Sequence, residues 1–105
     1  MEVIQWSSYL AAFFAGSFLT NAVPHFIHGI SGDKFPTPFS KPHGKGLSSP
    51  LVNTLWACFN LLIGYILLRS SEVSLNNKLL LLVFFIGILT ISILLSINFT
   101  KKDKE

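Results

Sequence analysis

The chain has 105 residues, of which 50% are hydrophobic and 12% are charged, whereas soluble domains carry about 25% charged residues. No Asp, Glu, Lys or Arg occurs within residues 3–32, 46–68 or 79–100, and each stretch is long enough for a membrane-spanning helix of about 20 residues. This pattern excludes a soluble globular protein, and membrane topology explains the net charge of +3 better than a nucleic-acid partner does.

We therefore predict an all-α integral membrane protein with three transmembrane helices and a long ordered loop, rich in Pro, Gly and Phe, between the first two. A cleaved signal peptide is disfavoured because the first charged side chain is the acidic Glu2 and no small-residue cleavage site follows the apolar run. The single membrane domain, residues 1–105, divides into spans over about 3–28, 50–69 and 78–99, a cytoplasmic loop over 29–49 and a cytoplasmic tail over 100–105.

The distribution of basic residues predicts the orientation. With three spans, the loop and the tail share one side of the membrane. That side carries six basic residues, and the connection between the second and third spans carries two. Because basic loops stay in the cytoplasm, we expect a bacterial inner (plasma) membrane protein with its N-terminus outside and its C-terminus cytoplasmic. The six basic residues are Lys34, Lys41, Lys45, Lys101, Lys102 and Lys104.

Polar residues in the first span recur at helical spacing. Ser17, Asn21, His25 and His28 are separated by 4, 4 and 3 positions, which places them on one face of a helix. Pro24 lies among them and removes one backbone hydrogen bond. We expect a kink or a helix end near Thr20 to Pro24.

The second span begins with a clear start signal. Ser49 precedes Pro50, and a serine cap followed by proline at the first helical position is typical of a helix N-terminus. Small residues and asparagines then share one face, where they favour close helix packing in lipid. These residues are Asn53, Ala57, Asn60 and Gly64.

An antiparallel hairpin of the first two spans brings the two polar faces together. If His28 is level with Pro50, residues whose numbers sum to about 78 lie side by side. The cytoplasmic half of the hairpin then contains a polar seam. The expected neighbours are His25 with Asn53, Asn21 with Ala57, and Ser17 with Asn60.

The third span has no organised polar face, and we interpret it as a lipid-facing anchor packed beside the hairpin. The loop is more distinctive, because helix–helix connections usually take about 2–8 residues. Its segment Phe35–Phe39, with two prolines, is expected to be extended. Its two aromatic side chains either dip into the membrane interface or cover the polar seam, and we favour an ordered lid over a flexible linker.

Three motifs stand in and beside this loop. They are Asn-x-x-Pro-His-Phe at residues 21–26, Phe-Pro-Thr-Pro-Phe at 35–39 and Ser-Ser-Pro-x-x-Asn-x-x-Trp at 48–56. Together they resemble a group of short, uncharacterised bacterial membrane proteins. The resemblance implies a bacterial membrane protein in which this region is distinctive. The group has no established activity, so the resemblance implies no chemistry.

Three histidines near one membrane face raise the question of a metal. His25 and His28 are three positions apart on a helix, and His43 or Asp33 from the loop is a candidate third ligand. No cysteine pair or carboxylate cluster accompanies them, which makes a metal site a weak expectation. The sequence leaves the cofactor open.

A catalytic interpretation also begins from His25. Beside Asn53 and under a loop that carries Asp33, its ring is a candidate general acid or base near a lipid headgroup or a quinone ring. Ser48 and Ser49, at the start of a helix, are candidates to receive a phosphate. No nucleophile–base pair is visible in the sequence.

The structural interpretation needs no ligand, because contacts between polar side chains hold membrane helices together at about 0.6 kcal/mol each. We predict a small accessory or binding protein, without enzymatic activity, that engages a membrane lipid or a partner subunit, or self-associates. The alternative is a membrane enzyme or binder of a lipid-soluble substrate, a quinone or lipid, that uses His25, His28 and Asn53. The candidate ligand-binding residues are Asn21, His25, His28, Phe35, Phe39, Ser48, Ser49, Asn53 and Asn60.

Overall fold

The computed structural model of the chain describes residues 5–103, and it is built from three long helices. They are α1 (Trp6–Ile30), α2 (Pro50–Ser71) and α3 (Lys78–Phe99). All three are long and apolar enough to cross a membrane, since 22 residues extend about 33 Å and the hydrocarbon core is about 30 Å thick. No strand is present within residues 5–103, so the expected all-helical class is confirmed.

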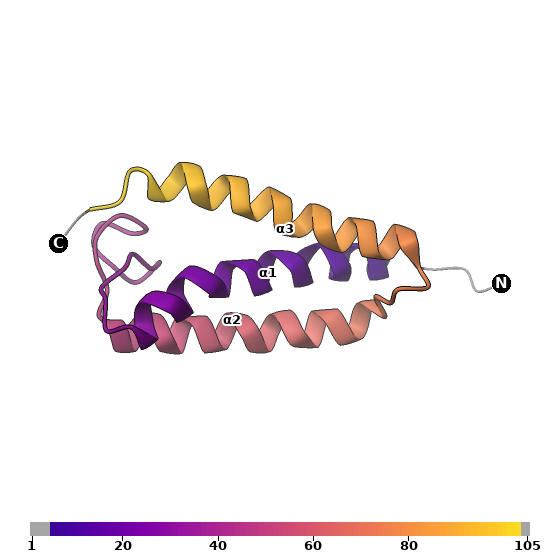
Figure 1. Ribbon diagram of the computed structural model, residues 1–105, viewed down its shortest axis with the longest axis horizontal. Coiled ribbons are helices and arrows are strands. Elements are labelled where there is room, and N and C mark those ends of the chain that lie inside the picture. Colours follow the sequence, from indigo (N-terminus) through magenta and orange to yellow (C-terminus); the bar gives the residue numbers. More distant parts are fainter. Residues whose placement is uncertain (1–4, 104–105) are drawn as a thin grey trace.

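Helix α1 occupies the middle of the molecule. It packs against α2 on one side and α3 on the other (Figure 1). The connecting loop (residues 31–49) and the end of α3 lie at one end of the bundle, and the start of α1 and the short α2–α3 turn lie at the other. The central position of α1 brings its polar residues into contact with both neighbours.

The helix boundaries follow local signals, with one correction. The Ser49 side chain accepts a hydrogen bond from the amide of Val52 at 3.1 Å, and Pro50 is the first helical residue, as expected. Helix α1, however, continues through Pro24 to Ile30. A helix end before the proline is therefore wrong, because packing against neighbouring helices supports a proline within an apolar helix. The expected start of the first span at residues 3 and 4 lies outside the described residues.

Two glycines bring α1 and α3 into backbone contact. A methyl group at Gly16 would overlap the carbonyl oxygen of Phe84, and one at Gly87 would overlap that of Phe13. The hydroxyl of Ser17 donates to the Phe13 and Gly87 carbonyls at 3.0 and 3.3 Å. The third helix is therefore not only a lipid-facing anchor. Its small residues let its backbone pack closely against that of α1.

The predicted buried face of α2 is confirmed: Asn53, Ala57, Asn60 and Gly64 are all buried. Their contacts with α1 follow the expected register at one point and depart from it at another. The His25 ring meets Asn53, with 2.8 Å between Nδ1 and Oδ1. Asn21 donates to Asn60 at 3.1 Å rather than lying beside Ala57.

The departure is a shift of the whole hairpin. A methyl group at Gly29 would overlap the backbone of Thr54, and one at Gly64 would approach that of Leu19, so the closest backbone pairs have numbers that sum to 83 rather than 78. Asn21 therefore lies nearly level with Asn60, about one helical turn from its expected neighbour. Ser17, expected beside Asn60, bonds to α3 instead.

Candidate functional site

The connecting loop folds back on itself over the end of the bundle. Phe35 and Ser48 exchange two backbone hydrogen bonds of 3.2 and 3.0 Å. The hydroxyls of Thr37 and Ser48 are 2.6 Å apart, and both side chains are buried. The loop therefore buries polar groups that satisfy one another.

The two phenylalanines of the loop face different surroundings. Phe35 is only 5% exposed. Its ring stacks on that of His28, with ring centroids 4.2 Å apart. It also makes an edge-to-face contact with Phe99, with ring centroids 4.6 Å apart. Phe39 is 63% exposed and touches the Trp56 ring at 5.3 Å. Of the two expected positions, Phe35 takes the one over the polar seam and Phe39 lies at the surface.

Asn53 joins the loop to the helices. Its side chain is fully buried, and its amide nitrogen donates to the backbone carbonyls of Phe35, Ser48 and Ser49 at 2.9, 3.2 and 3.0 Å. Its oxygen faces the His25 ring. One side chain thus connects α1, α2 and both ends of the loop.

This network also assigns the tautomer of His25. Three carbonyl acceptors identify Nδ2 of Asn53, so the atom that meets His25 is the Asn53 carbonyl oxygen. His25 Nδ1 must then carry the proton and donate it. Its Nε2 remains an acceptor, and no hydrogen bond to it is found within residues 5–103. The ring is 2% exposed.

A cavity of about 360 Å³ lies between the loop and the helix ends. It falls within the range of about 300–1,000 Å³ that is typical of small-molecule sites. His25 lines it, and so does Trp56, whose buried indole Nε1 has no hydrogen-bond partner in the described part of the chain. The other polar residues that line this loop cavity are Asn21, Thr37, His43 and Asn98.

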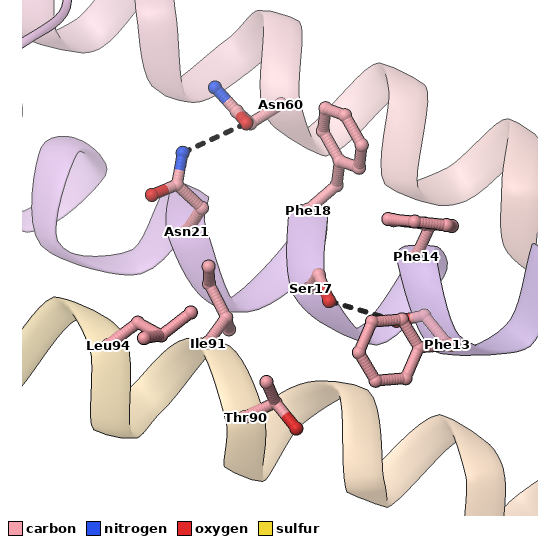
Figure 2. A pocket seen from close by; sticks show the side chains of 9 residues that line it. All are labelled: Phe13, Phe14, Ser17, Phe18, Asn21, Asn60, Thr90, Ile91 and Leu94. Atoms are coloured by element: carbon pink, nitrogen blue, oxygen red, sulfur yellow. Dashed lines mark hydrogen bonds between the residues drawn. The ribbon is translucent and has the colours of Figure 1, made fainter.

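A second cavity, of about 380 Å³, lies deeper in the bundle (Figure 2). Its lining is mainly apolar, with three phenylalanines from α1 and aliphatic side chains from α3. Asn21 lines both cavities. The full lining of this mid-bundle cavity is Phe13, Phe14, Ser17, Phe18, Asn21, Asn60, Thr90, Ile91 and Leu94.

The residues considered for a metal are not brought together. No group of three His, Cys, Asp or Glu side chains suitable for an ion occurs among residues 5–103. His28 Nδ1 lies 3.7 Å from an Asp33 oxygen, and His43 Nδ1 donates to the Pro38 carbonyl at 2.6 Å. The His43 ring is thus bonded within the loop, whereas His28 Nδ1 is buried beside Asp33 without a hydrogen bond among the described residues.

The two serines considered as a phosphate site already form hydrogen bonds within the protein. Ser48 Oγ pairs with the hydroxyl of Thr37. Ser49 Oγ occupies the capping position on α2, which is where an anion would meet the helix N-terminus. The geometry therefore favours a structural role for both serines.

Of the polar and aromatic residues that line the loop cavity, four were not among the predicted site residues: Thr37, Trp56, Asn98 and Phe99. Trp56 carried a signal, because it follows Asn53 by three positions and so shares its helix face. Asn98 is a polar residue at the end of an apolar span. The contact of Phe99 with Phe35 depends on the docking of α3, which leaves no trace in the sequence pattern.

Comparisons of the chain with protein-family models, with curated proteins and with solved structures find no match. The functional argument is therefore built on the geometry of the loop, the two cavities and the residues that line them.

Proposed function

We propose that this protein is a small binding protein of the bacterial inner membrane that uses its connecting loop as an ordered lid to engage a membrane lipid. It acts without catalysis, as an accessory protein. Three helices of sufficient length and apolarity support membrane insertion. The resemblance of its motifs to short bacterial membrane proteins supports the choice of membrane.

The loop cavity carries the proposal. A histidine that is 2% exposed lines it with an unbonded acceptor nitrogen, and a buried indole N–H lacks a partner among the described residues. Polar atoms inside a protein usually have hydrogen-bond partners, so the unbonded His25 Nε2 beside a cavity marks a place where a ligand contributes the missing bond. The cavity also lies at the loop end of the bundle, which is the expected cytoplasmic end.

The lid supports binding in a second way. Asn53 and Phe35 hold the loop against α1 and α2 through buried contacts. A site held in place before the ligand arrives loses less conformational entropy on binding. We propose that this preorganisation is the main function of the His25–Asn53 pair.

The alternative, an enzyme acting on a lipid-soluble substrate, rests on the same His25 nitrogen. A general base needs a partner that reacts or orients the substrate. Among the described residues that line the loop cavity, no carboxylate, cysteine or serine stands beside His25. The geometry therefore supports binding more strongly than turnover.

Native mass spectrometry of the protein extracted in mild detergent tests the proposal. We expect one lipid molecule per chain in the wild type, and loss of that mass in the His25→Ala variant. Ser70→Ala, at an exposed position of α2, is the matched control and should retain the lipid. Bare protein, or an oligomer with nothing bound, would contradict lipid binding and indicate a protein partner instead.

A further inference from the structure

The two cavities lie end to end along α1. Asn21 lines both, and Figure 2 shows its amide nitrogen bonded to Asn60 while its oxygen points toward the C-terminal part of α1. Phe13 borders the mid-bundle cavity and His25 the loop cavity. The helix rises about 18 Å between these residues, which is close to one leaflet of a bilayer core about 30 Å thick.

The deeper part opens sideways to the membrane. Phe14 and Leu94 line it and are 47% and 56% exposed on the outside of the bundle. Its remaining walls are mostly apolar, from Phe18 and Ile91 among others. An alkyl chain from the surrounding leaflet would therefore enter without crossing a polar barrier.

The loop end is polar but uncharged. No Asp, Glu, Lys or Arg lines either cavity in the described part of the chain. The free groups are the Nε2 acceptor of His25 and the side-chain amide of Asn98, for which no hydrogen bond is found within residues 5–103. The indole nitrogen of Trp56 is itself buried, but the Trp56 ring also lines the cavity and its centroid lies 6.5 Å from that of His25.

Resting on the lipid-binding function proposed above, we infer that the two cavities form one groove for a single-chain amphiphile with an uncharged, hydroxyl-bearing head. The head lies under the loop, where a hydroxyl donates to His25 Nε2 and its oxygens accept from Asn98. The chain lies along α1 in the mid-bundle cavity. A phosphate or carboxylate head is disfavoured because no cation lines the site to compensate for its lost hydration.

The chain offers a natural reporter for this site. It has two tryptophans, and Trp6 is 74% exposed at the opposite end of α1, so Trp6→Phe leaves Trp56 as the only fluorophore. We would titrate this variant with monooleoylglycerol and follow Trp56 emission, which shifts when a ligand in the loop cavity changes the surroundings of the indole ring. Oleate and methyl oleate have the same chain with an anionic head and with no hydroxyl, respectively. We expect each to bind at least about tenfold more weakly.

Two variants separate the head site from the chain site without removing an internal hydrogen bond. Asn98→Leu removes the free amide from the loop cavity, and Ile91→Phe fills the mid-bundle cavity. Both should reduce monooleoylglycerol binding by about tenfold or more. Ile93→Phe adds the same ring to α3 at a side chain that is 51% exposed and that lines neither cavity, so it should bind like the parent.

The results distinguish this inference from the function on which it rests. If oleate binds as tightly as monooleoylglycerol, the protein binds lipid but the uncharged-head assignment is wrong. If Asn98→Leu and Ile91→Phe bind like Ile93→Phe, the probe is only dissolving in the micelle and the groove assignment is wrong. If no probe binds and the extracted protein carries no lipid mass, both the groove and the lipid-binding function are wrong.

Discussion

Asn53 is the residue on which the candidate site depends most. Replacing it with leucine, which has a similar size, removes one bond from each of three backbone carbonyls, which keep their backbone N–H donors, and leaves the His25 N–H unpaired. A buried group left unpaired costs about 1–3 kcal/mol. We expect Asn53→Leu to lower the free energy of unfolding by at least this amount, measured by denaturation in mixed micelles. Asn76→Leu, at an exposed site in the α2–α3 turn, should change it by less than about 0.5 kcal/mol.

The His25–Asn53 contact is tested by combining two substitutions. A double-mutant cycle with His25→Ala and Asn53→Ala isolates the pair energy from the other bonds of Asn53. Polar contacts in membrane proteins average about 0.6 kcal/mol and reach about 1.7 kcal/mol. We expect a coupling in the upper half of this range, because both side chains are almost fully buried. Additive effects of the two substitutions would show that the 2.8 Å contact contributes nothing measurable.

Individual contacts could be predicted from the sequence only in part. The spacing of polar residues on two helices predicted the meeting of His25 with Asn53, and the structure confirms it. The same spacing misplaced the partner of Asn21, because the two helices are shifted by about one turn from the expected register. The unbonded indole of Trp56 has no sequence signature at all, since a missing partner is a property of the folded surroundings.

At the scale of elements, the α1–α3 crossing depends on two glycines. A methyl group at Gly87 meets the backbone carbonyl of Phe13, and backbone cannot move aside as a flexible side chain can. Overpacking of this kind costs about 1–3 kcal/mol, so Gly87→Ala should lower the free energy of unfolding by that much. Ile86→Ala in the same helix, at a side chain that is 43% exposed, is the control. An unchanged stability in Gly87→Ala would contradict the close crossing.

The connecting loop offers a matched pair of variants within one motif. Phe35 is buried against His28 and Phe99, whereas Phe39 is 63% exposed. Phe35→Ala removes a buried ring, typically worth about 3–5 kcal/mol in a well-packed core, and should release the loop. Trypsin should then cut after the exposed Lys45 much faster than in the wild type. Phe39→Ala should be cut at the wild-type rate, and rapid cutting of the wild type itself would contradict an ordered lid.

Hydropathy predicts the number of spans in this molecule, but not their order in space. All three helices are apolar, and only the structure shows that α1 lies between the other two (Figure 1). The polar face of α1 was expected to meet α2 alone, yet Ser17 bonds α3 and Phe99 of α3 packs on Phe35. The groove is therefore made by three helices and the loop, and no pair of spans contains it.

The orientation of the whole molecule decides from which leaflet this groove is filled. The six basic residues of the loop and tail predict that both are cytoplasmic. Replacing Cys58, the only cysteine, with serine permits single cysteines at Ser31 in the loop or at Ser74 in the α2–α3 turn, both exposed. In intact cells, a maleimide that cannot cross the inner membrane should label Ser74→Cys and leave Ser31→Cys unlabelled until the membrane is permeabilised. The opposite pattern would place the loop cavity outside, where its ligand would have to come from the outer leaflet.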